Sequence, residues 1–303
     1  MICNRFIFKE KRMKQIVLYL VTVLIWGSTW IAIKFQLGDV DPMVSVIYRF
    51  GLAAAVLFAV CKLRGLTLKF SLQEHCFMAL LGGCLFSLNY WFIYQAEIYL
   101  TSGITAVVFS SLVFFNIANN RLFRGVAVSG KTFWGAVVGI GGICLIYQGE
   151  IGSFNLADQG VKGLIFALSS VLLASFGNIT SARNTKAQIP VIQANAFGMA
   201  YGTLALGVIA LCLDKPFAFS FSLPYIGSLT FLALFGSIVA FGAYLTLIGT
   251  MGADKASYAI TVVPVVALLI STFAEGYVWT LPAMAGLGFV LAGNIIVLAR
   301  KPA

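Results

Sequence analysis

Long apolar stretches separated by short polar connectors follow one another along almost the whole chain. Each stretch is close to the roughly 20 residues that a helix needs to cross a bilayer. Each must be helical, because an unpaired backbone polar group in hydrocarbon costs several kcal/mol. The pattern therefore predicts an all-α integral membrane fold with ten transmembrane helices. The predicted spans are Ile16–Phe35, Met43–Cys61, Cys76–Tyr99, Thr101–Phe123, Thr132–Gln148, Val161–Ala182, Val191–Leu213, Tyr225–Met251, Ala256–Tyr277 and Leu281–Ala299.

Composition agrees with a membrane protein. Of the 303 residues, 60% are hydrophobic and only 10% are charged, whereas soluble domains carry roughly 25% charged residues. There are too few polar side chains to coat a water-soluble globule, so the lipid bilayer is the expected solvent. Ten spans with short connectors leave no room for a soluble domain.

The basic residues give the expected orientation. Of the twenty Lys and Arg residues, sixteen lie on one side: before the first span, after the tenth, and in or at the edge of the connectors after the second, fourth, sixth and eighth spans. Only Lys34, Lys162 and Lys215 fall on the other side, and Arg49 lies within a span. The positive-inside rule places the sixteen in the cytoplasm. The net charge of +10 is therefore a topology signal, and we expect an inner-membrane protein with both termini cytoplasmic and no nucleic-acid partner.

The cysteines and the one histidine predict no metal site or cofactor. Most cysteines lie inside apolar stretches, and no pair has CxxC spacing, so we interpret them as small residues of the membrane core rather than as disulfides or ligands. A single histidine, His75, cannot form a metal site alone.

The chain also contains an internal repeat. With a shift of 151 residues, Gly125 falls on Gly276, Gly135 on Gly286 and Gly142 on Gly293. We expect a basic segment at 1–14, a first five-helix half at 15–150 and a second at 160–303. Because five is odd, the second half enters the membrane upside down. Such inverted repeats are common in transporters, whose substrate site lies at the interface of the halves near the midplane.

Several short motifs resemble the drug/metabolite transporter superfamily, EamA type. They occur in order along nearly the whole chain: Trp26-Gly27-Ser28-Thr29-Trp30, Pro42 with Arg49, Gly252-Ala253-Asp254-Lys255-Ala256-Ser257-Tyr258, Val263-Pro264-Val265 and Glu275-Gly276. The resemblance implies a ten-helix inverted-repeat fold that transports metabolites, often exporting amino acids or related compounds. The first half departs from the pattern, with Val113 where the family has proline and Arg124 where it has an acid.

Arg49 lies about two helical turns inside the second span, roughly 10 Å below Pro42. A charge in lipid needs a reason. One interpretation is an anchor for a substrate carboxylate, which a guanidinium binds through two parallel hydrogen bonds. The other is a structural or gating role, with Glu97 or Asp41 as the partner, or snorkelling of the side chain to the outer surface.

The third span carries a stripe of polar and aromatic side chains. Ser87, Tyr90, Tyr94 and Glu97 have the spacing of one helix face, and Trp91 lies beside them. The stripe predicts a cavity for an amphipathic solute; the alternative is an aromatic belt at the membrane interface.

Further candidates for the cavity are spread over other spans: Thr29, Trp30, Asn178, Tyr244 and Tyr258. Hydrogen bonding between helices is the alternative for each. Pro264 removes one backbone hydrogen bond inside the ninth span and predicts either a hinge or a static kink.

Taken together, the sequence predicts a secondary transporter, not an enzyme, that moves a small molecule such as an amino acid or metabolite across the inner membrane by alternating access. The alternative is a non-transport membrane protein such as an intramembrane enzyme or a channel. Glu97 and Glu275 lie near outer span ends, so neither is a clear proton carrier.

Overall fold

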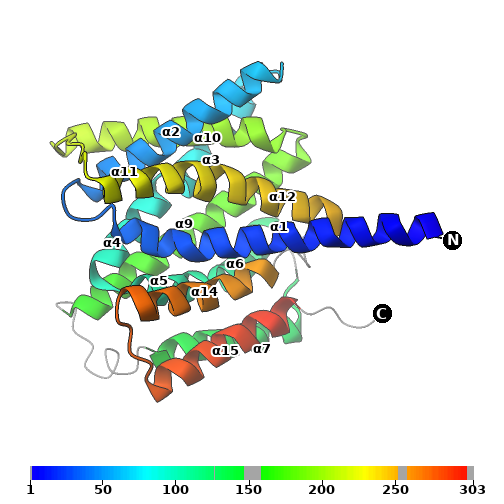
Figure 1. Ribbon diagram of the computed structural model, residues 1–303, viewed down its shortest axis with the longest axis vertical. Coiled ribbons are helices and arrows are strands. Elements are labelled where there is room, and N and C mark those ends of the chain that lie inside the picture. The colour runs from blue at the N-terminus through cyan, green and yellow to red at the C-terminus, as the bar shows by residue number, and fades with distance from the viewer. Residues whose placement is uncertain (1, 126, 147–157, 252–257, 299–303) are drawn as a thin grey trace.

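The computed structural model describes residues 2–125, 127–146, 158–251 and 258–298. Within these ranges all regular structure is helical, and the helices run side by side in one bundle (Figure 1). The first half contains α1 (Ile2–Lys34), α2 (Pro42–Leu63), α3 (Leu72–Leu85), α4 (Leu88–Tyr99), α5 (Ser102–Phe109), α6 (Leu112–Arg124) and α7 (Gly130–Ile146). The second half contains α9 (Gln159–Lys186), α10 (Val191–Cys212), α11 (Leu223–Thr230), the π-helix η1 (Phe231–Val239), α12 (Ala240–Met251), α14 (Tyr258–Ala274) and α15 (Leu281–Leu298).

The prediction of an all-helical membrane fold is confirmed. In the described part of the chain, 7 helical stretches are long and apolar enough to cross a membrane. The shorter apolar helices are Gly130–Ile146, Ala259–Ala274 and Leu281–Val297. The described part of every predicted span falls on one of these helical stretches, and residues 147–148, 256–257 and 299 of the predicted spans lie outside the described residues. The count of ten crossings and the inverted repeat stay predictions.

Three predicted spans differ in detail from the structure. The third breaks at Phe86–Ser87, where Ser87 has φ −132° and ψ −97°. The fourth breaks at Ser110–Ser111, although this chain has Val113 where the family has a proline. The first helix begins at Ile2 rather than near Ile16, because the Lys, Arg and Glu residues of the basic segment are good helix formers.

Local sequence explains where several helices begin. Asp41 precedes Pro42 and its side chain accepts a hydrogen bond of 2.8 Å from the Met43 amide. A short polar cap followed by proline at the first helical position is a strong start signal. Asp158 caps α9 in the same way through the Gly160 amide, also at 2.8 Å.

Glycines allow the last helix of each half to approach closely. α7 and α15 lie side by side at one edge of the bundle (Figure 1). Gly135 of α7 faces Gly293 of α15, and Gly142 of α7 faces Gly286 of α15, so the two helices run antiparallel. Other helix contacts correspond between the two halves. α2 packs on α10, and α5 packs on α14. α1 contacts α14 and α12, as α9 contacts α6 and α4.

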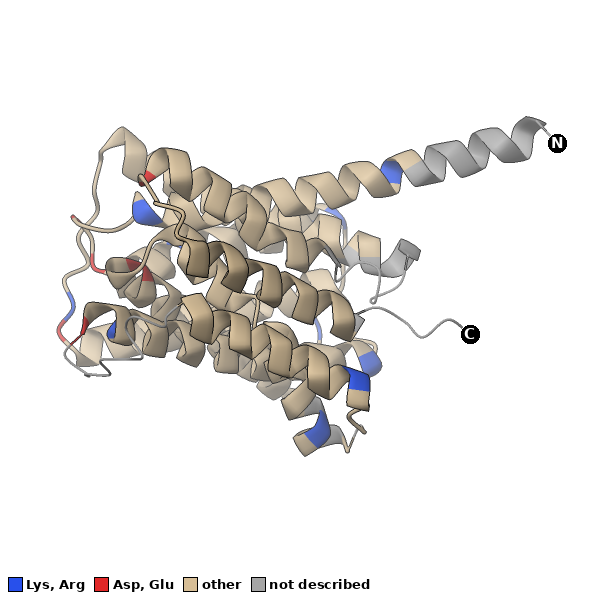
Figure 2. Ribbon diagram, turned by 90° about the horizontal axis from the view of Figure 1, so that it is seen from below, with Lys and Arg blue, Asp and Glu red and all other residues tan. Residues whose placement is uncertain are grey.

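Charge is distributed unevenly along the bundle. In Figure 2 the visible Asp and Glu residues lie at the left end of the bundle. Lys34 and Lys215, two of the three lysines expected on the outer side, lie at this acidic end and each pairs with an acid. This distribution agrees with the orientation expected from the connectors, which itself stays a prediction.

Candidate functional site

Arg49 of α2 is the largest fully buried side chain in the described part of the chain, with 1% of its surface exposed. Its guanidinium carbon lies 4.4 Å from the ring centre of Tyr90 and 5.0 Å from that of Phe50. Its Nε donates a hydrogen bond of 3.3 Å to Ser237 Oγ. Aromatic faces stabilise a desolvated cation, so the rings of Tyr90 and Phe50 hold the guanidinium in place between the helices.

Hydrogen-bonding atoms near Arg49 are left without partners. Within the described residues, Arg49 Nη1, Tyr94 Oη and both carboxyl oxygens of Glu97 are buried and make no hydrogen bond. Tyr94 and Glu97 are each 0% exposed, and both Arg49 and Glu97 act electrostatically on the Tyr94 hydroxyl. Because an unpaired buried polar group costs about 1–3 kcal/mol, such a group of donors and acceptors suits a ligand.

The opposite wall of this site comes from η1 and α1. A methyl group placed on Gly236 would lie 2.9 Å from Thr29 Cγ2 and 3.5 Å from Arg49 Nη2. Trp26 Nε1 donates a hydrogen bond of 3.3 Å to the Gly236 carbonyl. Ser237 Oγ donates to the Leu232 carbonyl, five residues earlier, at 2.9 Å. The π-helix therefore brings Gly236 and Ser237 against the guanidinium, and π-helical turns frequently occur at functional sites.

The sequence did not reveal η1. The only signal was a Gly236-Ser237 pair inside a long apolar stretch, and a pair of small residues is common wherever membrane helices pack closely. We call Thr29, Arg49, Tyr90, Tyr94, Glu97, Gly236 and Ser237 the central site.

The structure gathers some of the predicted site residues and not others. Thr29, Tyr90, Tyr94, Arg49 and Glu97 belong to the central site. Tyr244 packs on Trp26, with the two ring centres 5.1 Å apart.

Four predicted residues have other neighbours. Trp30 packs on Phe109 at 5.3 Å and Trp91 on Phe92 at 5.0 Å, both between ring centres. Asn178 donates a hydrogen bond of 3.4 Å to Asn116, which is the helix-to-helix bonding given as the alternative. Tyr258 opens α14, but its side chain lies outside the described residues.

Pro264 is buried inside α14. A methyl group on Gly27 of α1 would lie 3.6 Å from the carbonyl oxygen of Val263, next to this proline. Gly27 therefore lets α1 approach α14 closely at the point where Pro264 interrupts the helical hydrogen bonds.

One predicted partner of Arg49 is wrong. Asp41 caps α2 and pairs with Lys215 at 2.9 Å, so its carboxylate is used at the outer end of the bundle. Glu97 makes no ion pair with Arg49 either: in the described ranges the ion pairs are Lys34–Glu275 and Lys215–Asp41. The sequence places Arg49, Asp41 and Glu97 on the same side of the membrane, but it does not show which side chains pair in the folded protein.

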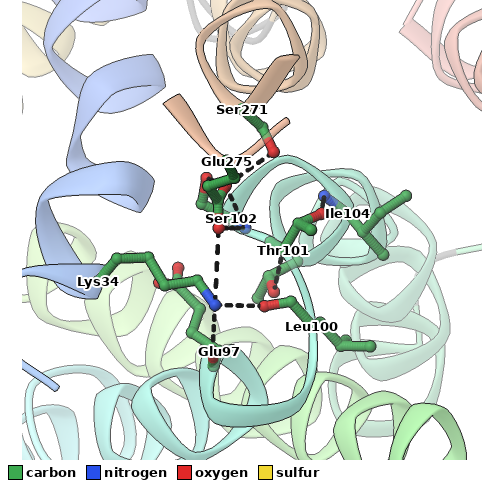
Figure 3. Close-up of polar contacts among 9 residues, drawn as sticks. Lys34, Glu97, Leu100, Thr101, Ser102, Ile104, Ser271 and Glu275 are labelled. Carbon is green, nitrogen blue, oxygen red and sulfur yellow. Dashed lines mark hydrogen bonds and ion pairs between the residues drawn. The ribbon is translucent and has the colours of Figure 1, made fainter. Parts of the chain in front are cut away.

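A second polar group, which we call the outer cluster, consists of Lys34, Ser102, Ser271 and Glu275 (Figure 3). Lys34 Nζ donates to the carbonyls of Glu97 and Leu100, the latter at 2.6 Å, and lies 3.6 Å from Glu275 Oε1.

Glu275 completes the outer cluster. It accepts hydrogen bonds from the Ser102 amide at 3.0 Å, from the Ser102 hydroxyl, and from the Ser271 hydroxyl at 2.7 Å. A carboxylate at the start of α5 is stabilised by the helix dipole. The outer cluster thus ties together the ends of α1, α4, α5 and α14.

An open cavity of about 600 Å³ reaches this region from the outer end of the bundle. Its lining residues are Lys34, Leu37, Gly38, Val40, Asp41, Pro42, Glu97 and Ile98. Glu97 therefore belongs both to the cavity and to the central site. No three His, Cys, Asp or Glu residues gather into a metal-binding group in the described part of the chain.

Comparison with known proteins identifies the class of protein. The EamA-like transporter family matches residues 13–148 and again residues 161–299. The "Uncharacterized inner membrane transporter YedA" of Escherichia coli strain K12 is 29% identical over 92% of this chain and 88% of its own length. Protein PagO of Salmonella typhimurium strain LT2 is 23% identical over 94% of this chain and 93% of its own length.

A solved crystal structure has a similar fold, with a TM-score of 0.66 and 17% identity over 92% of this chain and 94% of that one. The family matches cover almost all of the sequence, and the relatives are similar over nearly their full length. The chain therefore belongs to the EamA-like transporter family and is a membrane transporter.

Proposed function

We propose that this protein exports amino acids or related metabolites across the inner membrane as a secondary transporter. The observation that carries the proposal is Arg49, a buried guanidinium with a free Nη1 donor beside Tyr90 and Tyr94. A guanidinium binds a carboxylate through parallel, charge-assisted hydrogen bonds. The aromatic rings around it suit the apolar part of an amphipathic solute.

The proposed mechanism is alternating access between two inverted five-helix halves. Three observations support it: the family matches the chain twice, helix contacts occur in matching pairs, and α7 and α15 pack antiparallel through glycines that the 151-residue shift relates. Two similar halves in opposite orientations can exchange conformations, and the exchange opens the site to one side and then to the other.

The outer cluster fits such a mechanism as a closure at the outer end. Lys34 and Glu275 hold α1 and α14 to the ends of α4 and α5. Outward opening would require these contacts to separate. We further propose that both termini face the cytoplasm, which is supported by the sixteen basic residues of the inner connectors and termini.

Transport by the purified protein in liposomes tests the proposal. We expect saturable flux of at least one amino acid or related carboxylate from a broad labelled panel. Arg49→Gln should abolish most of this flux. Tyr90→Ala should reduce the flux more than Trp91→Ala does, because Trp91 lies outside the central site. Size-exclusion chromatography and circular dichroism confirm that each variant is folded.

Two results would count against the proposal. Folded wild-type protein without flux of any compound in the panel would refute transport of amino acids and related carboxylates. Flux that is equally strong for substrates with and without a carboxylate would refute the role of Arg49.

A further inference from the structure

We propose that Glu97 binds the ammonium group of the substrate, so that the central site holds a zwitterion between Arg49 and Glu97. The inference rests on the proposed transport function and adds to it a residue that determines specificity. It starts from the unusual position of Glu97, whose carboxylate is fully buried without a partner.

The surroundings of Glu97 do not satisfy its carboxylate. The charged side chains that act on it are those of Lys34 from α1, Glu275 after α14 and Arg49 from α2. Lys34 Nζ is already used by the carbonyls of Glu97 and Leu100 and by Glu275 (Figure 3). A buried carboxylate without a cation at hydrogen-bonding distance is costly, so the carboxylate of Glu97 is free to bind a cation from outside the protein.

The other buried polar groups without hydrogen-bond partners indicate the chemistry of the molecule that carries this cation. Tyr90, Tyr94 and Glu97 follow one another along one face of α4, with Arg49 packed against the ring of Tyr90. Along this face Tyr94 lies between Tyr90, which packs on Arg49, and Glu97, and both charged groups act electrostatically on its hydroxyl. A donor at one end, acceptors at the other and a hydroxyl between them complement a carboxylate and an ammonium on the same small molecule.

The cavity gives such a ligand a route from the outer end. Glu97 is the deepest charged group among its lining residues, because Lys34 and Asp41 are more exposed and already paired. Because the Glu97 carboxylate is itself fully buried, an ammonium leaving it would enter the cavity once the side chains that cover the carboxylate move apart. The neighbouring acid Glu275 does not offer the same site, because the hydroxyls of Ser102 and Ser271 and the Ser102 amide occupy its oxygens.

Competition with matched analogues tests the inference. Transport of the labelled amino acid with the greatest flux is measured in proteoliposomes in the presence of an unlabelled competitor. The competitors are the same amino acid, its deaminated analogue and its decarboxylated analogue. In wild-type protein we expect the intact amino acid to compete at least about tenfold better than the deaminated analogue, since an ionic group left unpaired in the site costs that much or more.

Variants then locate the effect. Glu97→Gln should lose this preference and bind the deaminated analogue as well as the intact amino acid, whereas Glu97→Asp should retain a reduced preference. Glu275→Gln is the matched control at a neighbouring acid and should leave the ratio of the two inhibition constants unchanged.

The outcomes separate the two proposals. If wild-type protein transports the amino acid but the deaminated analogue competes equally well, the inference about Glu97 is wrong and the transport function stands. An unchanged ratio in folded Glu97→Gln protein leads to the same conclusion. If folded wild-type protein moves no compound, the proposed function itself fails. The wild-type comparison needs no variant and so remains decisive even where Glu97→Gln does not fold.

Discussion

Gly135 and Gly293 lie against each other so closely that a methyl group on Gly135 would be 2.9 Å from the Gly293 carbonyl oxygen. Gly142 and Gly286 make the equivalent contact further along the same two helices. The 151-residue shift relates Gly135 to Gly286 and Gly142 to Gly293. Exchanging the halves therefore converts one contact into the other, as a local two-fold axis between α7 and α15 requires.

This contact predicts a sharp difference between glycines of one helix. A side chain on Gly293 would meet the Gly139 backbone, with Cβ 2.6 Å from its nitrogen, whereas Gly288 has open space around it. Gly293→Leu should destabilise the protein by about 1–3 kcal/mol through overpacking, and Gly288→Leu should have little effect. Thermal unfolding in detergent measures both. Equal melting temperatures for the two variants would contradict the close approach of α7 and α15.

Much of the fold can be read from the sequence because lipid imposes a simple rule. A segment of suitable length and hydrophobicity must be helical there. Val191–Leu213 was predicted and Val191–Cys212 is observed, and the Asp41-Pro42 pair marks the start of α2. Such limits depend on local residues, which the sequence displays directly.

The central site is harder to predict because its contacts link distant residues. Arg49 bonds to Ser237, which lies 188 positions later, and no local pattern announces that pair. The sequence placed Glu97 near an outer span end, where exposure is expected. Instead its side chain is 0% exposed, and Lys34 of α1 donates a hydrogen bond to its backbone carbonyl. The aromatic stripe was visible from spacing alone, but which of its rings contacts a charge depends on how α2 packs on α4.

The π-helix provides a second prediction, at the wall of the central site. Gly236→Ala places a methyl group 2.9 Å from Thr29 Cγ2, so Thr29 or the π-helix must shift beside the guanidinium of Arg49, which lies 3.5 Å from the same methyl group. Small displacements of a binding group are costly, so we expect the KM for transport to rise by about three- to tenfold. Gly242→Ala, six residues later in the same span, meets nothing within 4 Å and should transport normally. Similar kinetics for both variants would exclude Gly236 from the site.

The outer cluster provides a third prediction, about stability. Glu275→Ala removes the ion-pair partner of Lys34 and leaves the Ser102 amide without its acceptor. Because this group is largely buried, with 14% of the Glu275 side chain exposed, we expect a loss of about 1–3 kcal/mol.

The matched control is the more exposed pair of Lys215 and Asp41, in which 36% of the lysine side chain is accessible. Lys215→Ala should cost less than about 1 kcal/mol, as is usual for surface ion pairs. Chemical or thermal unfolding of both variants in the same detergent gives the comparison. A larger effect from Lys215→Ala would show that the outer cluster does not hold the ends of α1 and α14 together.

The fourth prediction concerns orientation in the membrane. Ser71 and Ser222 are both exposed, and they lie at opposite ends of the bundle. Ser71 lies in the connector after the end of α2. Ser222 lies near the start of α2, because its neighbour Ser220 donates a hydrogen bond to Asp39, just before that helix. The basic residues of the connector before Ser71 predict that it faces the cytoplasm. In a cysteine-free background, a membrane-impermeant maleimide applied to intact cells should label Ser222→Cys and leave Ser71→Cys unlabelled until the membrane is permeabilised. The reverse pattern would invert the orientation, and with it the direction in which the cavity beside Glu97 opens.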